Sequence, residues 1–473
     1  MDQRAIPALP ALAPGASPLE RADDAAHGLM RRMPALSAHR VITTGQSVAF
    51  ALLAALLLAA SCHWPGGAWN ALVALTSFTF VAGTIFRAAL ALVGGLSRPS
   101  ETPASGALPL YTILVPLYRE ANVLPRLARA LLLLDYPRDR LDIKLIVEED
   151  DAATIALARE IARRGPFDVI VVPCIQPRTK PKACNFALSF ARGEFIVIFD
   201  AEDRPERDQL RKAVAAFRAR SDRVACLQAR LNFYNANENW LTRLFALDYA
   251  LWFDILLPGL DRIGVPMPLG GTSNHFRTNV LRELGGWDPF NVTEDADLGI
   301  RIAQLGLRVA MLDSTTFEEA PARIDVWLKQ RSRWLKGYMQ TWLVHTRRPF
   351  ALVRRAGWSG FFAFHLFIGG AIATALSNPF LLVMFVASVI WPGEREASVI
   401  ALSGLAGGNL VLTLLAMLSP LQRGPRHLAP YGLTVALYWM MISAAAWRGL
   451  YQLIVRPFHW EKTEHGLSRQ RPR

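Results

Sequence analysis

The sequence predicts an α/β domain with a doubly wound, mostly parallel sheet, inserted between two groups of transmembrane helices. Two observations support this prediction. Apolar runs long enough to cross a bilayer lie before residue 97 and after residue 357, whereas residues 111–346 contain none. In that central stretch, short apolar strands alternate with helical segments, which is the order that forms parallel sheets.

The composition is that of a membrane protein with a basic surface. Of the 473 residues, 52% are hydrophobic, and 52 Lys and Arg outnumber 39 Asp and Glu. An excess of basic residues suits the cytoplasmic face of a lipid bilayer. We expect no nucleic-acid partner, because the chain has no helix-turn-helix signature, zinc-finger spacing or basic low-complexity arm. The four cysteines are scattered, which argues against a disulfide framework or a zinc site.

The N-terminal part of the chain combines a polar tail with two apolar runs. Residues 1–40 are rich in Ala and Pro and predict a disordered cytoplasmic tail, with weak helicity as the alternative. Residues 41–96 predict two transmembrane helices, the second of which is interrupted by Arg87. A signal peptide is disfavoured at the first run, because about 40 residues precede it.

Residues 105–346 form the predicted cytoplasmic sheet domain. Its first strands are YTILVPL, DIKLIVEE, DVIVVP and EFIVIFD, and predicted helices separate them. In doubly wound sheets, ligands bind at the carboxyl ends of the strands. Here those ends carry acidic residues, which are Glu120, Glu148 to Asp151, and Asp200 to Asp203. The sequence therefore places its acid clusters at the expected ligand edge.

Residues 358–450 predict three or four further transmembrane helices. The first apolar run, 358–391, is too long for one ordinary span, and SNP at 377–379 interrupts it. Two short helices there would form a hairpin, give six crossings in all, and keep the basic tail, residues 451–473, in the cytoplasm. One long helix would put that tail outside, and the basic loop LQRGPRH favours this alternative. We expect the hairpin.

The stretch IVIFDAEDRPE places three carboxylates directly after a buried strand. Asp200 and Glu202 are separated by one residue, so both can turn toward one divalent cation, and Asp203 can support them. Mg²⁺ and Mn²⁺ prefer oxygen ligands and often bridge to phosphates. The alternative is a helix N-cap, since acids after a strand also favour the first turn of the next helix.

Two further motifs follow in the chain. In NVTEDADLG, Glu294 and Asp295 precede a predicted helix, and a desolvated Asp295 could act as a general base. The alternative is a capping box with Thr293 as the cap. In QRSRW, Gln330 and Arg333 could hold a diphosphate. The surrounding aromatic residues recur at helical spacing, which an interfacial helix over residues 323–346 would also explain.

These motifs together resemble a known family. DAED, then TED about 90 residues later, then QxxRW about 35 further on, flanked by membrane helices, resemble the membrane-embedded family 2 glycosyltransferases. Cellulose, hyaluronan and exopolysaccharide synthases belong to this group, which has the GT-A fold. VPLYRE resembles the first-strand element, with Arg119 where the family has Asn, and GGTSNHF at 270–276 resembles the acceptor-side loop. The clusters EEDD, DAEDRPE and FHWEKTEHG are similar to the branch that includes phage-adsorption protein B.

The resemblance implies a role for each motif residue. It implies that Mg²⁺ or Mn²⁺ binds Asp200 and Glu202, and that Asp295 is the base that Glu294 orients. It implies that the donor contacts Tyr118, Glu120, Glu148 or Asp150, Lys182 and Asp200. It implies that the acceptor and the leaving diphosphate contact Gly271, Thr272, Asn274, Gln330, Arg333 and Trp334. The family has paired Asp at the second strand end, where this chain has EEDD, so which acid contacts the nucleoside stays open.

The expected function is therefore an inverting, metal-dependent sugar transfer at the bacterial inner membrane. The resemblance implies a nucleotide-sugar donor, with a UDP-sugar expected, and a growing polysaccharide or a polyprenyl-linked acceptor. QxxRW favours the polysaccharide, and a homo-oligomer or a secretion partner would then complete the channel. One alternative is a membrane assembly or phage-adsorption protein that keeps the fold without the chemistry. The other is solute transport, for which Arg87 and His365 are the ionisable candidates within the spans.

Overall fold

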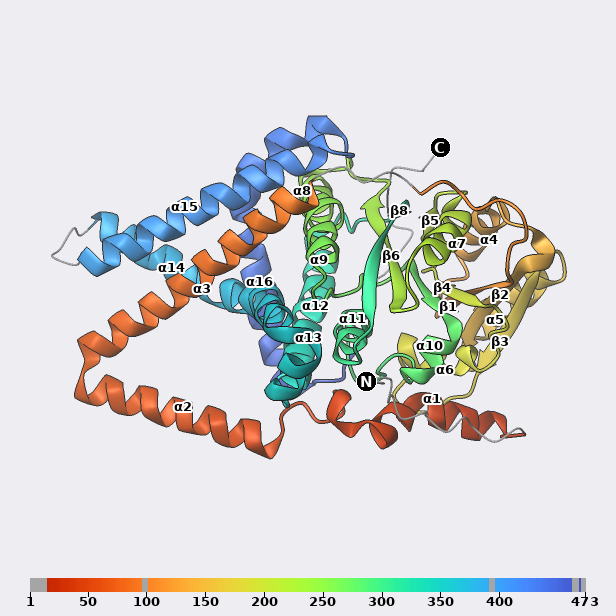
Figure 1. Ribbon diagram of the computed structural model, residues 1–473, viewed down its shortest axis with the longest axis horizontal. Helices are drawn as coiled ribbons and strands as arrows, with labels where there is room; N and C mark the ends of the chain where they lie inside the picture. Colours follow the sequence, from red (N-terminus) through yellow and green to blue (C-terminus); the bar gives the residue numbers. More distant parts are fainter. Residues whose placement is uncertain (1–14, 96–100, 391–395, 462–467, 469–473) are drawn as a thin grey trace.

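An eight-stranded sheet forms the centre of the domain on the right of Figure 1. The long helices α2 (Thr44–His63), α3 (Pro65–Gly94), α14 (Gly370–Ile390) and α15 (Glu396–Leu418) extend to the left. The computed structural model describes residues 15–95, 101–390, 396–461 and 468. The strand order is β3-β2-β1-β4-β7-β6-β8-β5. The strands are β1 Tyr111–Leu117, β2 Leu141–Glu148, β3 Phe167–Val172, β4 Phe195–Ile198, β5 Arg204–Pro205, β6 Val224–Phe233, β7 Asn274–Arg277 and β8 Arg308–Glu318.

The first half of the sheet is parallel, as the sequence predicts. Strand β1 pairs in parallel with β2 and β4, and β2 pairs in parallel with β3. Three crossover helices connect these strands, which are α4 Leu124–Leu132, α5 Ala152–Ala162 and α6 Lys180–Leu188. The strands are apolar because both faces of the sheet are covered: Ile113 and Val115 pack on one face, and Leu114 packs on the other.

The second half of the sheet is mixed. Strand β7 runs antiparallel between β4 and β6, and the short β5 runs antiparallel to β8. The helices of this half are α7 Gln209–Ala219, α8 Trp240–Tyr249, α9 Leu257–Ile263, α10 Thr278–Glu283, α11 Glu294–Gln304 and α12 Ile324–His345, with a π-helical segment η3 Ala250–Leu256 between α8 and α9. The predicted, mostly parallel α/β sheet is confirmed, and β7 is its principal antiparallel member.

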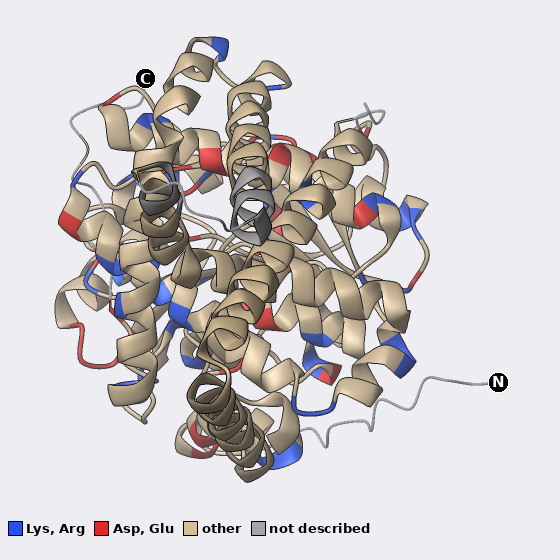
Figure 2. Ribbon diagram, turned by 90° about the vertical axis from the view of Figure 1, so that its left-hand side faces the viewer, with Lys and Arg blue, Asp and Glu red and all other residues tan. Residues whose placement is uncertain are grey.

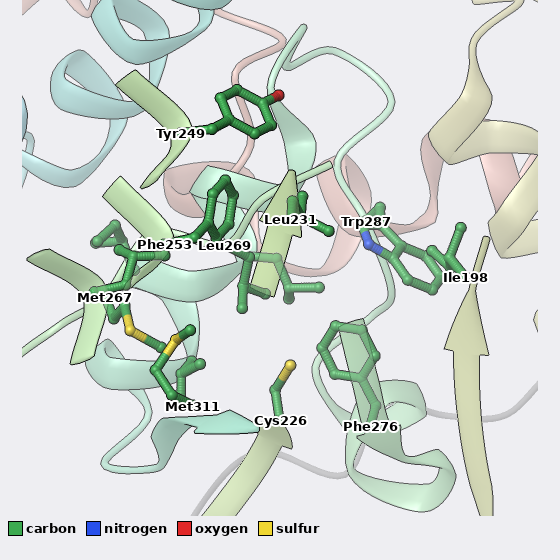
Figure 3. Packing of buried hydrophobic residues seen from close by; sticks show 14 of the residues in the cluster. Ile198, Cys226, Leu231, Tyr249, Phe253, Met267, Leu269, Phe276, Trp287 and Met311 are labelled. Carbon is green, nitrogen blue, oxygen red and sulfur yellow. The ribbon is translucent and has the colours of Figure 1, made fainter. Parts of the chain in front are cut away.

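A buried core lies directly behind the loop that precedes α11. Trp287 in GGWDPF is 1% exposed, and its ring meets that of Phe276 on β7 edge-to-face, with 5.8 Å between the centroids. Figure 3 shows Trp287 beside both Phe276 and Ile198 of β4. The indole thus ties the start of α11 to two central strands.

The described residues include five helices that are long and apolar enough to cross a membrane. They are Thr44–His63 (α2), Pro65–Gly94 (α3), Pro349–Met384, Gly404–Leu421 and Arg426–Val455. The last three contain α13 Pro349–Phe364, the π-helical segment η4 His365–Gly369, α14 Gly370–Ile390, α15 Glu396–Leu418 and α16 Val435–Val455. Figure 2 looks onto these helices, and the ribbons nearest the viewer carry few charged residues.

The expected hairpin at 358–391 is wrong. Pro379 lies inside α14, which continues unbroken through SNP, so the run forms one helix instead of two short arms. The helix tolerates this proline because the packing of its neighbours outweighs one lost backbone hydrogen bond. The break falls earlier, at Gly357, whose positive φ of 72° interrupts α13. Counting the run as one span leaves five candidates instead of six crossings.

The two described ends of the chain nevertheless lie on the same domain. Helix α1, Pro18–Arg32, packs on α6, and the residues after α16 reach α12, where Lys336 donates to the carbonyl of His459. An odd number of crossings would separate these ends, so at most four of the five candidate helices cross one bilayer. Helix α16 packs against α12 of the sheet domain, and α3 packs against α9 (Figure 1).

The N-terminal tail differs from the expected disorder over its described part. Residues 18–32 form α1, which a Ser17–Glu20 capping box begins. Its buried face consists of Ala22, Ala25, Ala26, Gly28 and Leu29. Small residues let α1 approach α6 closely, and this is why an Ala-rich stretch without a strong apolar stripe folds here. Residues 1–14 of the predicted tail lie outside the described residues.

Candidate active site

A cavity of about 640 Å³ lies at the carboxyl ends of β1, β2 and β4 and continues between α12 and the candidate membrane helices. The structure brings eleven of the sequence-predicted residues to its wall, which are Tyr118, Glu120, Glu148, Asp200, Glu202, Gly271, Glu294, Asp295, Gln330, Arg333 and Trp334. Four predicted residues lie outside this lining, namely Asp150, Lys182, Thr272 and Asn274.

The acidic residues at the end of β2 make different contacts. Glu148 lines the cavity and accepts a hydrogen bond from Lys182 at 2.8 Å, so the Lys182 ammonium lies behind Glu148 and away from the cavity. Asp150 pairs with Arg178 at 2.6 Å. Asp151 caps α5 and accepts from the backbone of Arg119. Glu148 is therefore the acid of EEDD that can meet a ligand directly, although burial raises its pKa.

Lys180 is the cation that reaches the acids of the cavity. Its Nζ atom lies 2.6 Å from Oδ1 of Asp200 and 2.7 Å from the carbonyl oxygen of Gly271. Burial acts to lower the pKa of Lys180, but Asp200, Asp295 and Glu294 together raise it well above its usual value. Lys180 is the first residue of α6, and the buried Lys182 follows two residues later in the same turn. It is thus ionised and centrally placed.

Asp203, Thr272 and Asn274 build the loops that shape the cavity. Asp203 is 1% exposed and accepts hydrogen bonds from the backbone of Asp200, at 2.7 Å, and from the hydroxyl of Thr272. Asn274 donates to the carbonyl of Gly270 at 2.8 Å. The contact between Asp203 and Thr272 joins the DAED turn to the GGTSN loop, so that Asp200 and Gly271 lie close together at the cavity wall, where Lys180 bonds both.

A cluster of carboxylates surrounds Asp200. Burial, with repulsion from Asp200 and Glu202, raises the pKa of Asp203 well above its usual value. Burial raises the pKa of Glu318 at the end of β8 likewise, with repulsion from Asp203 and Glu202. Such mutual repulsion is what a bound cation would relieve, so the donor set fits a hard divalent metal.

The protein supplies only part of a metal's coordination. Among the described residues, no three Asp, Glu, His or Cys side chains converge in a preformed metal site. Asp200 and Glu202 both line the cavity and would provide one or two oxygen ligands, with the diphosphate of a bound ligand providing others.

Asp295 lies in the first turn of α11 and lines the cavity. Its side chain is buried, and its Oδ1 atom has no hydrogen-bond partner among the described residues. Burial and the neighbouring Glu294 raise the pKa of Asp295 well above its usual value. The alternative of a capping box is wrong, because Thr293 is the N-cap residue but its side chain makes no capping hydrogen bond.

Arg333 projects from α12 toward these acids. Burial lowers the pKa of its guanidinium, and the negative charges of Glu294, Asp200 and Asp295 act in the opposite direction. It also lies over the ring of Trp460, 4.4 Å from the centroid. Beside it, the Oε1 atom of Gln330 is buried without a partner among the described residues. Arg333 thus presents guanidinium donors suited to a diphosphate, and Gln330 adds an unpartnered carbonyl acceptor.

The aromatic stripe of α12 faces protein. Trp327 is fully buried, and Trp334, Tyr338 and Trp342 are partly buried against the core. The predicted helix over 323–346 is present as α12, Ile324–His345, and its place at a membrane interface stays a prediction. Helix α12 lies between α11 and α16, so its aromatic side chains fill the space between the sheet domain and the membrane helices.

Residues 109–337 match the model of a family described as "Glycosyltransferase like family 2". The chain contains a family 2 glycosyltransferase domain. Its fold is similar to that of the mannosyltransferase PcManGT from Pyrobaculum calidifontis, solved with GDP-Man and Mn²⁺ (TM-score 0.53, 21% identity, 80% of this chain and 99% of that one). The glycosyltransferase domain therefore has the GT-A fold, as the motifs imply.

Two relatives of the glycosyltransferase are similar over its catalytic part. The probable glycosyltransferase YdaM of Bacillus subtilis is 26% identical over 298 residues, which cover 60% of this chain and 71% of that protein. The beta-monoglucosyldiacylglycerol synthase of Trichormus variabilis is 28% identical over 289 residues, which cover 58% of this chain and 60% of that protein. The match thus covers less than two thirds of the second relative.

Sequence reasoning missed three residues of the glycosyltransferase cavity. Lys180 shares the PRTKPKACN stretch with Lys182, and no sequence signal tells which of the two faces the cavity. Glu318 ends a strand, which is a signal that could have found it. Trp460 lies in the tail FHWEKTEHG, more than 100 residues beyond QRSRW, so only the folded chain brings it to Arg333.

Proposed function

We propose that this chain is an inverting, metal-dependent glycosyltransferase that moves a sugar from a nucleotide-sugar donor to an acceptor at the membrane. One observation carries the proposal: Asp200, Asp295 and Arg333 line a single cavity, although they come from a strand end, a helix start and a membrane-flanking helix. These are the side chains needed to hold a diphosphate, to remove a proton and to stabilise a leaving group.

Asp295 acts as the general base. Its unpartnered Oδ1 atom takes the proton of the acceptor hydroxyl as that oxygen bonds to the anomeric carbon of the sugar. The bond from this carbon to the diphosphate oxygen breaks at the same time, on the opposite face. A single displacement of this kind inverts the anomeric configuration and needs no covalent nucleophile on the protein.

The cations of the cavity stabilise the departing diphosphate. Arg333 offers a planar guanidinium, and Lys180 offers an ammonium group next to Asp200. Asp200 and Glu202 would hold Mg²⁺ or Mn²⁺, which would supply further positive charge at the diphosphate. The Mn²⁺ named with the similar mannosyltransferase supports this assignment.

We further propose that the catalytic domain faces the cytoplasm of a bacterium. Nucleotide-sugars are cytoplasmic, and the chain's excess of basic residues favours the same side. The membrane then holds the acceptor, which enters the cavity between α12 and the helices beside it. The named glucosyldiacylglycerol synthase among the relatives supports a membrane acceptor.

A nucleotide-release assay on the detergent-solubilised chain tests the proposal. UDP-glucose, UDP-galactose, UDP-GlcNAc and GDP-mannose would be supplied with Mn²⁺ or Mg²⁺, and then with EDTA. We expect release from one donor, abolished by EDTA, and a rate about 10²- to 10⁴-fold lower in Asp295→Asn. Unchanged release in Asp295→Asn would refute the assigned base. No release from any donor, by a folded chain, would favour the alternative of an assembly protein without activity.

A further inference from the structure

The inner part of the cavity lies among apolar helices. Beyond Arg333 and Trp334 its wall is formed by residues of α3, α14, α15 and α16, such as Phe80, Ala371 and Leu412. The cavity is continuous from Asp295 to this wall. A ligand that fills it therefore has a reactive end near the acids and an apolar remainder among the helices, which describes a lipid.

Arg87 is the charged residue of this wall, which also includes the polar residues Thr374, Asn378, Asn409 and Ser443. It lies on α3 within a candidate membrane span and lines the cavity. Among the described residues it has no hydrogen bond or ion pair, in contrast to Arg331, which pairs with Asp248 in the same cavity. The guanidinium borders Gly83, where an added Cβ would lie 3.2 Å from Nη1, so the helix leaves room for it.

An unpaired arginine inside a membrane domain indicates a missing anion. Burying a guanidinium without a counter-ion is unfavourable, so such residues mark ligand sites or ion paths. The planar guanidinium binds phosphate with two parallel hydrogen bonds. A neutral glycan or a diacylglycerol would leave Arg87 without a counter-ion, whereas the phosphate of a lipid would neutralise it.

We propose that Arg87 binds the phosphate of a lipid acceptor, whose apolar chain lies among α3, α14, α15 and α16. This inference rests on the proposed function and names the acceptor class as a phosphate-bearing lipid. The lipid is either an isoprenoid phosphate or a phospholipid with a free hydroxyl. In both cases an acceptor oxygen bonds to the anomeric carbon, and the bond to the nucleoside diphosphate breaks. The proton of a hydroxyl acceptor, or of an isoprenoid phosphate that binds as its monoanion, goes to Asp295.

The test follows labelled sugar into the organic phase. The solubilised chain would receive labelled donor with micelles that contain undecaprenyl phosphate, phosphatidylglycerol or diacylglycerol. We expect a labelled lipid from one of the two phosphate-bearing lipids, and which of them reacts identifies the source. In Arg87→Gln the KM for that lipid should rise about tenfold or more, and the KM for the donor should stay within about twofold. Arg87→Lys keeps the charge but loses the paired hydrogen bonds, so its KM for that lipid should lie between the values of the unaltered chain and of Arg87→Gln.

Arg354→Gln is the matched control, because Arg354 is exposed on α13 and does not line the cavity. It should behave as the unaltered chain. Equal use of diacylglycerol, label only in a water-soluble polymer, or an unchanged KM for the lipid in Arg87→Gln would overturn the inference. Native mass spectrometry tests lipid binding without any sugar transfer, so it distinguishes failure of this inference from failure of the proposed function. We expect it to detect bound undecaprenyl phosphate or phosphatidylglycerol in the unaltered chain. In Arg87→Gln this bound lipid should be lost.

Discussion

The Nζ atom of Lys180 lies 2.6 Å from Oδ1 of Asp200, so an ammonium group holds the carboxylate that we propose as a metal ligand. The cavity thus carries an internal cation where the donor's metal would bind. Asp200 would hold the metal of a bound donor, and Lys180 would then be free to bond the phosphate oxygens. The two neighbouring lysines of PRTKPKACN should therefore respond differently to substitution.

Lys180→Gln should raise the KM for the donor roughly 10- to 100-fold, because a charge-assisted hydrogen bond to the diphosphate is lost. Steady-state nucleotide release against donor concentration measures this change. Lys182→Gln is the matched control. It removes the partner of buried Glu148 and should lower the free energy of unfolding by about 3–5 kcal/mol, seen as a lower Tm. If the two variants showed the reverse pattern, Lys182 would be the donor-binding residue.

Trp460 and Arg333 should act as a coupled pair. A stacked guanidinium is attracted to the indole by about 0.5–2 kcal/mol, which corresponds to roughly 2- to 30-fold in kcat/KM if the contact orients Arg333. Trp460→Ala should therefore lower kcat/KM by that factor in the unaltered chain and have little further effect in Arg333→Gln. Trp358→Ala, at an exposed tryptophan, is the control. Additive effects of Trp460→Ala and Arg333→Gln would show that the two residues act independently.

Gly337 should be needed for the spacing between α12 and the TED motif. A Cβ atom there would lie 2.2 Å from Oγ1 of Thr293, directly before Glu294 and Asp295. Gly337→Ala should move the base relative to Arg333 and lower kcat about tenfold or more, since small displacements of reacting groups have large effects. Gly407→Ala, where nothing lies within 4 Å, is the control. Thr293→Ala removes the two nearest atoms and should restore part of the rate; no loss in Gly337→Ala would refute this role.

The N-terminal segment should stabilise the domain in a pH-dependent way. Asp288 accepts hydrogen bonds from Ser37 and from the backbone of Ala38, and burial, with repulsion from Asp297, raises its pKa to about 6. Because this pKa is raised in the folded state, the protonated carboxyl of Asp288 adds to the free energy of unfolding at low pH. This contribution is lost as the pH rises through 6 and the buried carboxyl ionises. From pH 5 to pH 8 the chain should lose about 1.4 kcal/mol through this group.

Asp288→Asn removes that ionisation. Its Tm should therefore fall less between pH 5 and pH 8 than the Tm of the unaltered chain, as thermal unfolding in detergent at both values would show. Asp222→Asn, at an acid that is 83% exposed, is the control. A steeper fall in Asp288→Asn than in the unaltered chain would contradict the assignment.

Sequence reasoning reached the parts of the site that follow from local rules. The strand-end acids Asp200 and Glu148 could be predicted because parallel strands end at one edge of a sheet. Contacts between distant parts of the chain could not be predicted from the sequence. The tail residue Trp460 contacts α12 only because α16 brings the tail there. The Ala-rich stretch at 18–32 folds only because α6 provides a surface for it to pack on. The Pro379 helix was mistaken for a turn because neighbouring helices, invisible in the sequence, hold it straight.

The tail that completes the cavity is also the last described part of the chain to leave the ribosome. Trp460 lines the cavity, and a two-bond ion pair between Arg448 of α16 and Glu461 holds the tail in place. Asp200 and Asp295 are translated 260 and 165 residues earlier. In a nascent chain the carboxylates of the cavity would therefore be in place before the indole of Trp460 packs beside Arg333. That contact forms only after α16 has docked. Biosynthesis itself would then delay sugar transfer until assembly in the membrane is complete.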